Sequence, residues 1–172
     1  MRGLPRLLSL WRRPKPVVGA TPCDVMHAEN KWRLLRYRSP EGPRHKTPVL
    51  LVPSLINRHY VLDLMPGKSF AEWLVAQGHD VWCIDWGSPS GEDRYVTFDD
   101  VVDRALGRAL RKLPQRPHVL GYCMGGTLAA IHLAAHPEAF ASFVGLAAPV
   151  RFDDDGLLSR WTRAKAFDVD AL

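Results

Sequence analysis

The sequence predicts an α/β fold in which a mostly parallel sheet is flanked by helices. Its 172 residues are enough for one domain with a substantial core, and 47% of them are hydrophobic. Short continuous apolar runs, typical of strands covered on both faces, alternate with segments of helical spacing. This order of strands and helices is typical of parallel sheets built with right-handed crossovers.

The first half of the chain begins this pattern. KWRLLRYR (31–38) alternates enough for an early strand, and VLLVP (49–53) has the continuous apolar character of a central strand. SFAEWLVAQG (69–78) has helical spacing and ends at Gly78, where a helix is expected to stop. DVWCID (80–85) is the next short buried strand.

The second half continues it with two helices and two strands. Thr97 is placed to cap a helix over 98–113, which carries its acidic residues early and its basic residues late, as the helix dipole prefers. HVLGY (118–122) is predicted as a third buried strand. MGGTLAAIHLAAH (124–136) is predicted as a helix of small residues, and SFVGLAAPV (142–150) as a fourth strand.

The net charge of +5 arises in the leading segment. From residue 16 onward, 18 basic and 18 acidic side chains balance, so a basic face for binding phosphates is missing and we expect no nucleic-acid partner. The excess consists of five residues with no acid among them: Arg2, Arg6, Arg12, Arg13 and Lys15. No stretch approaches the ~20 apolar residues of a membrane-spanning helix, so no transmembrane segment is expected.

We divide the chain into a basic tail, residues 1–19, and a partial domain, residues 20–172. The tail MRGLPRLLSLWRRPKP has an apolar patch that Pro5 interrupts, and it lacks the continuous apolar stretch and cleavage site of a secretory signal. Two interpretations stay open, a disordered start and a short amphipathic anchor on an apolar or anionic surface.

Three widely spaced cysteines predict neither a disulfide framework nor a zinc site, and they favour a cytoplasmic protein. Cys83 lies inside a predicted strand and is expected in the core. Cys23 lies in a stretch predicted as irregular and receives no role. Cys123 stands between a predicted strand and a predicted helix, which is where reacting groups occur in parallel sheets.

Gly121-Tyr122-Cys123-Met124-Gly125 has the G-x-S-x-G spacing of a nucleophile elbow, with cysteine in place of serine. A small buried thiol at a glycine-rich helix start is the alternative interpretation, but the strand before the motif and the helix after it favour a nucleophile. Gly121 and Gly125 leave room for a tight turn, and Gly126 lets the helix approach the sheet. The positive end of the helix dipole favours the thiolate of Cys123.

An oxyanion formed at Cys123 needs hydrogen-bond donors. The backbone N–H of Met124 is one candidate, because it follows the nucleophile directly. A second donor is expected from the loop SLINRHY after the 49–53 strand, where the N–H of Leu55 or Ile56 is the candidate. No metal site is predicted.

These residues resemble the polyhydroxyalkanoate (poly-3-hydroxybutyrate) synthase family, thioesterase-like enzymes of the α/β-hydrolase fold that use cysteine in a G-x-C-x-G-G box. The resemblance extends from about residue 20 to the end, through residues 52–89 and 148–161 as well as GYCMGG. Within 52–89 it includes Asn57, Tyr60, Asp63, Leu64, Gly78, Asp85 and Trp86.

The resemblance implies an acyltransferase that polymerises (R)-3-hydroxyacyl-coenzyme A, which is a substrate rather than a bound cofactor. Cys123 would attack the thioester and hold the acyl group until a hydroxyl group extends the polyester. The family also uses a histidine base and an assisting aspartate, both after the nucleophile in the chain.

The sequence departs from this pattern because its last histidine is His136. Asp153 to Asp155 are interpreted as a solvated turn or a helix N-cap. His59 is the only histidine near the oxyanion loop, and a surface or lining position is favoured for it over a catalytic one. We therefore interpret the chain as a C-terminally truncated α/β-hydrolase-type domain that lacks the acid and base. Its fourth strand is expected to present an unpaired apolar edge, so we expect poor solubility or a partner, either a second subunit or another copy.

Two other functions stay open. A cysteine esterase or dienelactone-type hydrolase would share the elbow, but its oxyanion loop would usually begin with His-Gly, unlike SLINRHY. A non-catalytic or split-enzyme subunit would instead bind a partner or a polymer granule through the tail. We expect a cytoplasmic location, with granule association as an open alternative.

Overall fold

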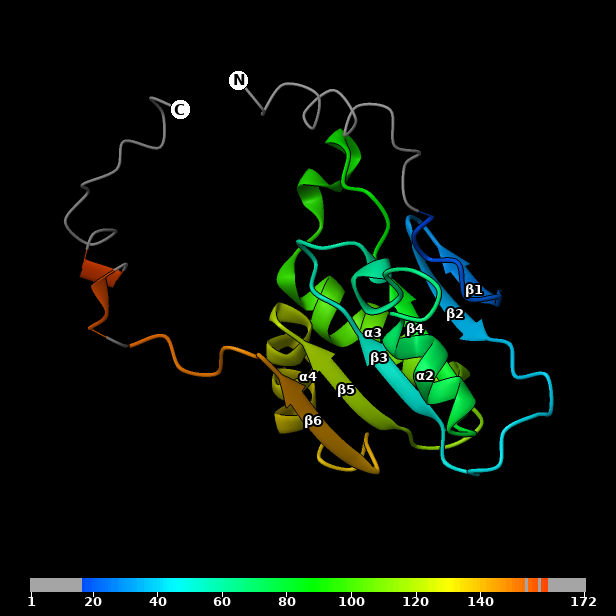
Figure 1. Cartoon of the computed structure of the whole chain (residues 1–172). Coiled ribbons are helices and arrows are strands. Elements are labelled where there is room, and N and C mark those ends of the chain that lie inside the picture. The colour runs from blue at the N-terminus through cyan, green and yellow to red at the C-terminus, as the bar shows by residue number, and fades with distance from the viewer. Residues whose placement is uncertain (1–16, 154, 158, 161–172) are drawn as a thin grey trace, which may run out of the picture.

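A computed structural model describes residues 17–153, 155–157 and 159–160, and it confirms the predicted α/β architecture. Six strands form one sheet in the order β1-β2-β4-β3-β5-β6 (Figure 1). The strands are β1 (Cys23–Glu29), β2 (Trp32–Tyr37), β3 (Val49–Val52), β4 (Val81–Asp85), β5 (His118–Tyr122) and β6 (Ser142–Leu146). The four strands from β3 to β6 are parallel where they pair, and β1 and β2 add an antiparallel edge.

Helices occupy the connections between the parallel strands. They are α2 (Phe70–Ala76), α3 (Leu106–Lys112) and α4 (Met124–Ala135), with the 3-10 turns η1 (His59–Leu62) and η2 (Gly91–Tyr95) and the π-helical segment η3 (Asp100–Ala105). No helix in the described residues is long and apolar enough to cross a membrane.

Alternating side chains of the central strands build two cores, one on each face of the sheet. The helix α2 covers one face, and α3 and α4 cover the other (Figure 1). In β3, Leu50 and Val52 face the core that α3 and α4 cover, whereas Val49 and Leu51 face the core that α2 covers. All four are buried, which explains why this strand has a continuous apolar sequence. Cys83 of β4 lies fully buried on the α2 side, as expected.

The helix predicted over 98–113 is present, but its first part has a different geometry. Thr97 caps it as expected: its hydroxyl accepts the Asp100 N–H at 3.3 Å, and the Asp100 carboxylate accepts the Thr97 N–H at 2.9 Å. Residues 100–105 then adopt π-helical hydrogen bonding before α3 begins. Side-chain spacing alone does not distinguish these two helical forms, so the sequence did not indicate the change.

The stretch around Cys23 is a strand, and the prediction of irregular structure there was wrong. Most side chains of β1 are exposed or half-buried, so its sequence has no apolar alternation to indicate a strand. Its structure comes from pairing with β2, and the register shifts between Val25 and His27. Ahead of β1, Thr21 is held by Asp63, which accepts its hydroxyl at 2.6 Å. Residues 1–16, most of the predicted tail, lie outside the described residues.

At the other edge of the sheet, β6 pairs with β5 and, within the described part of the chain, with no further strand. Val144 and Leu146 are 53% and 44% exposed. The expected apolar edge is therefore present in the structure.

Candidate active site

Cys123 lies where β5 turns into α4. Its backbone has φ 52° and ψ −129°, a left-handed conformation that a non-glycine residue adopts only at a cost in free energy. The Cys123 N–H donates to the Leu146 carbonyl of β6 at 2.9 Å, and the Cys123 carbonyl accepts from the Gly126 N–H at 2.9 Å. The side chain is partly exposed. A strand, a strained residue and a helix thus follow one another in the arrangement that a nucleophile elbow requires.

Three glycines make this turn sterically feasible. A Cβ atom on Gly121 would overlap Gly126, and one on Gly125 would overlap the carbonyl oxygens of Val52 and Pro53 at the end of β3. A Cβ on Gly126 would overlap the Ala148 side chain. The elbow is therefore packed against the end of β3, where the predicted oxyanion loop begins.

The loop after β3 shows which of its amides is already occupied. The Ile56 N–H donates to the hydroxyl of Ser54 at 3.1 Å, and Ser54 is fully buried. The Leu55 N–H has no acceptor among the described residues. Met124 opens α4, so its N–H has no carbonyl four residues earlier within the helix. Of the three candidate donors, Leu55 and Met124 thus have N–H groups without an acceptor among the described residues.

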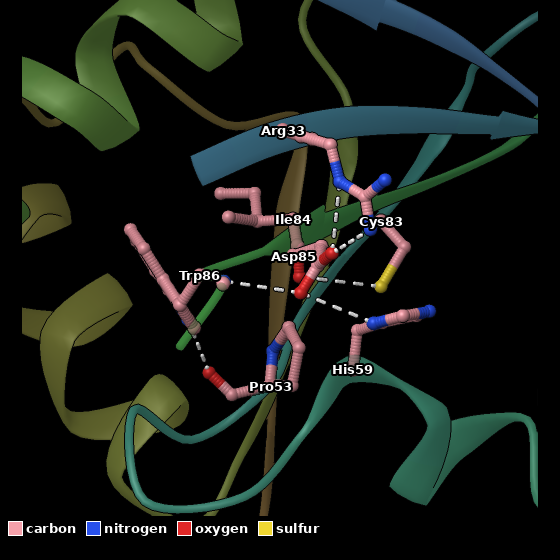
Figure 2. A network of polar contacts seen from close by, with 8 residues as sticks. Arg33, Pro53, His59, Cys83, Ile84, Asp85 and Trp86 are labelled. Atoms are coloured by element: carbon pink, nitrogen blue, oxygen red, sulfur yellow. Dashed lines mark hydrogen bonds and ion pairs between the residues drawn. The ribbon is translucent and has the colours of Figure 1, made fainter. Parts of the chain in front are cut away.

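A buried carboxylate organises the neighbouring strand end (Figure 2). Asp85, the last residue of β4, accepts hydrogen bonds from Arg33 Nε of β2 and from the Gly87 N–H, each at 3.1 Å. His59 Nδ1 of η1 lies 3.1 Å from Asp85 Oδ1, the oxygen that also accepts from Gly87, whereas Arg33 binds Oδ2. Burial raises the pKa of Asp85, but the hydrogen bonds from His59, Arg33 and Gly87 outweigh it and lower the pKa well below its usual range.

The structure connects this network to the oxyanion loop. Trp86 Nε1 donates to the Pro53 carbonyl at 2.8 Å, so the chain leaving β4 is tied to the chain leaving β3 (Figure 2). His59 is 19% exposed, and within the described residues no hydrogen bond joins it to Cys123. Asp85 and His59 were noted separately from the sequence, but their association with Arg33 was not predicted. The position of Asp85 at a strand end was the available signal.

A cavity of about 580 Å³ opens beside these loops. Leu55 and Trp86 line it together with Trp32, Tyr95 and Val96, so much of its wall is apolar. Cys123 is not among its lining residues.

The fold and the elbow define an α/β-hydrolase protein, and comparison with known proteins agrees. The family model described as alpha/beta hydrolase fold matches residues 47–170. A membrane phospholipase A aligns with a TM-score of 0.62 at 20% identity, over 94% of this chain and 49% of that one. A thioesterase domain from the curacin biosynthetic pathway aligns with a TM-score of 0.60 at 18% identity, over 84% and 52%. These two structures support the fold alone.

Sequence relatives place the chain more narrowly. Residues 16–74 match the model of the poly-beta-hydroxybutyrate polymerase (PhaC) N-terminus. The poly(3-hydroxyalkanoate) polymerase subunit PhaC of Haloferax mediterranei is 43% identical over 150 residues, which is 84% of this chain and 30% of that protein. The subunit of the same name from Allochromatium vinosum is 35% identical, over 88% of this chain and 45% of that protein. The chain belongs to the polyhydroxyalkanoate synthase family of the α/β-hydrolase fold, and it spans less than half the length of these relatives.

Proposed function

We propose that this chain carries the nucleophile of a polyhydroxyalkanoate synthase and that Cys123 takes the acyl group from an (R)-3-hydroxyacyl-coenzyme A. The observation that carries this proposal is Cys123 itself, held at φ 52° on a turn that its flanking glycines alone permit. The names of the relatives and the match to the polymerase N-terminus supply the substrate class.

The proposed acylation begins with attack of the Cys123 thiolate on the thioester carbonyl carbon. The developing oxyanion is stabilised by the N–H groups of Met124 and Leu55, with the Ile56 N–H retained by Ser54. The carbon–sulfur bond to coenzyme A then breaks, and coenzyme A leaves as a thiolate that takes up a proton. The acyl group remains on Cys123 as a new thioester.

Chain extension requires a base. The hydroxyl of another hydroxyacyl unit attacks the Cys123 thioester, an ester forms, and the cysteine sulfur is released while the hydroxyl proton is transferred. No histidine follows His136 in the sequence, so residues 147–172 do not contain the histidine base that the family resemblance implies. We therefore propose acylation of Cys123, and not chain extension, as the step that the described residues support.

Mass spectrometry of the intact chain with (R)-3-hydroxybutyryl-coenzyme A tests this proposal. We expect one acyl adduct, localised to the Cys123 peptide, and at most one equivalent of coenzyme A released per chain. Cys123→Ala removes the adduct, whereas Cys23→Ser, a change at the other partly exposed cysteine, retains it.

An adduct on Cys23, or no adduct while iodoacetamide still labels Cys123, would contradict the proposal. Release of free 3-hydroxy acid over many turnovers would instead support the hydrolase alternative. Granule binding that is lost on deletion of residues 1–16 would support a surface role for the tail.

A further inference from the structure

A second cluster of reactive side chains lies between η3 and α4. It contains Asp103 of η3, His132 of α4 and His136, which directly follows the last residue of α4. One ligand atom from each residue lies within 4.8 Å of the other two. We propose that these three side chains form a binding site for a divalent transition-metal cation of the zinc type.

Helix geometry brings the three residues together. His132 and His136 are four positions apart, so they lie on the same face of the helix, and their ring centroids are 4.6 Å apart. Asp103 comes from the facing π-helical segment, and its carboxylate Oδ1 lies 2.8 Å from His136 Nε2. π-helical turns often occur at functional sites, and this one places a carboxylate opposite two imidazoles.

The orientation of His132 is the observation that favours a metal over a simple ion pair. This residue is 4% exposed, and its Nδ1–H donates to the Val102 carbonyl at 2.8 Å. A ring nitrogen that donates to a backbone carbonyl is the arrangement found in metal-ligating histidines, because it leaves the lone pair of the other nitrogen available. Burial lowers the pKa of His132, which keeps the imidazole neutral as a ligand must be.

The donor set indicates the class of cation. Two imidazole nitrogens and one carboxylate oxygen suit Zn²⁺, Co²⁺ or Ni²⁺ better than Mg²⁺ or Ca²⁺, which prefer oxygen ligands. Asp103 and His136 are at least half exposed, so water can complete the coordination. Binding through His136 Nε2 would replace the hydrogen bond between Asp103 and His136 by two bonds to the cation, and the ring proton of His136 would move from Nε2 to Nδ1.

The site would stabilise the packing of two helical segments rather than catalyse a reaction. It would join the start of the helical region that ends in α3 to the last turns of α4, the helix whose first turn follows Cys123 (Figure 1). An ordinary ion pair between Asp103 and His136 requires no contribution from His132. A bound cation requires all three side chains.

Equilibrium dialysis of the full chain against Zn²⁺ tests the proposal, after chelator treatment and alkylation of its thiols. We expect one retained cation per chain and a rise in thermal midpoint on Zn²⁺ addition. Asp103→Asn and His136→Gln each lower the affinity by at least about tenfold, a loss at least as large as that for removing a supporting group. Both residues are exposed, so these variants are expected to fold, which circular dichroism checks.

His45→Gln is the matched control, since His45 is exposed and stacks on His79 in a separate histidine pair. This variant should bind Zn²⁺ as the unmodified chain does. Co²⁺ provides a second readout, because coordinated Co²⁺ absorbs visible light, and His132→Gln should remove that absorption. Failure of the unmodified chain to retain Zn²⁺, or equal retention by Asp103→Asn and His136→Gln, would overturn the proposal. Loss of binding in His45→Gln alone would do the same.

Discussion

The elbow at Cys123 and the network at Asp85 lie at the ends of parallel strands, but they are stabilised in different ways. The elbow is local: its residues are consecutive, and its shape follows from the absence of Cβ atoms at Gly121, Gly125 and Gly126. The Asp85 network joins β2, η1 and β4 through charge and hydrogen bonds. A Cβ atom added at an elbow glycine would collide with its neighbours, whereas the Asp85 network can lose one hydrogen-bond partner and still form. The two regions should therefore respond differently to substitution.

The largest effect is expected for Gly125→Ala. The new methyl group would overlap the carbonyl oxygens of Val52 and Pro53, and these backbone atoms of a central strand cannot move aside cheaply. We expect a loss of about 3 kcal/mol or more in the free energy of unfolding, measured by urea denaturation. Gly91→Ala is the control, because a Cβ at Gly91 meets no atom within 4 Å. Equal stability of the two variants would contradict the steric account of the elbow.

Asp85→Asn should lower the free energy of unfolding by less, about 2 kcal/mol at neutral pH. It removes the buried charge that contacts both His59 and Arg33. The pKa of Asp85 is lowered in the folded chain, so its contribution is present above the unfolded pKa of about 4 and is lost as the pH falls through the folded pKa. The difference in unfolding free energy between the two proteins should therefore stay constant from neutral pH to about pH 4, be smaller at about pH 3 and vanish only below the folded pKa. A difference that stays unchanged down to about pH 3 would argue against the charge as the cause.

Trp86→Phe isolates the connection between the two regions. It retains an aromatic ring but removes the Nε1 donor to the Pro53 carbonyl. This loss should lower the free energy of unfolding by about 1 kcal/mol. The more informative measurement is hydrogen exchange of the loop after β3, which we expect to accelerate while exchange of α4 amides is unchanged. Faster exchange throughout α4 would mean that the elbow depends on this bond as well.

The smallest effect on stability is expected for Cys123→Gly. Glycine adopts a φ of 52° without strain, so the variant should be as stable as the native chain or more stable by up to about 1 kcal/mol. Iodoacetamide labelling at this position and acylation should both disappear. A clear loss of stability would show that the sulfur contributes packing that outweighs the backbone strain.

The same contrast explains what could be predicted from the sequence. β3, β4, β5, α2 and α4 were predicted because their apolar runs and terminating glycines are local signals, and the elbow has a local spacing as well. β1 was missed because its strand pairing depends on β2 and not on its own side chains. The π-helical geometry of η3 leaves no trace in residue spacing.

The residues of the candidate site also separate into those with a local sequence signal and those that only the fold brings together. Cys123 and its glycines were identified from one short motif. The association of Arg33, His59 and Asp85 was not identified, because three elements distant in the chain must first assemble before these side chains meet. The preference for Leu55 over Ile56 as the proposed oxyanion donor also required the fold, since the hydroxyl of Ser54 accepts the Ile56 N–H.

The two edge strands of the sheet differ in how readily they can pair with a further strand. At β1 the register shift between Val25 and His27 disturbs the backbone and discourages a further strand from joining, although Val25 and Met26 are exposed there. At β6 the pairing register with β5 is regular, no further strand pairs with it in the described part of the chain, and Val144 and Leu146 are exposed. Any lengthening of this sheet, whether by the same polypeptide or by another, should therefore begin at β6, and concentrated solutions should associate through that edge first.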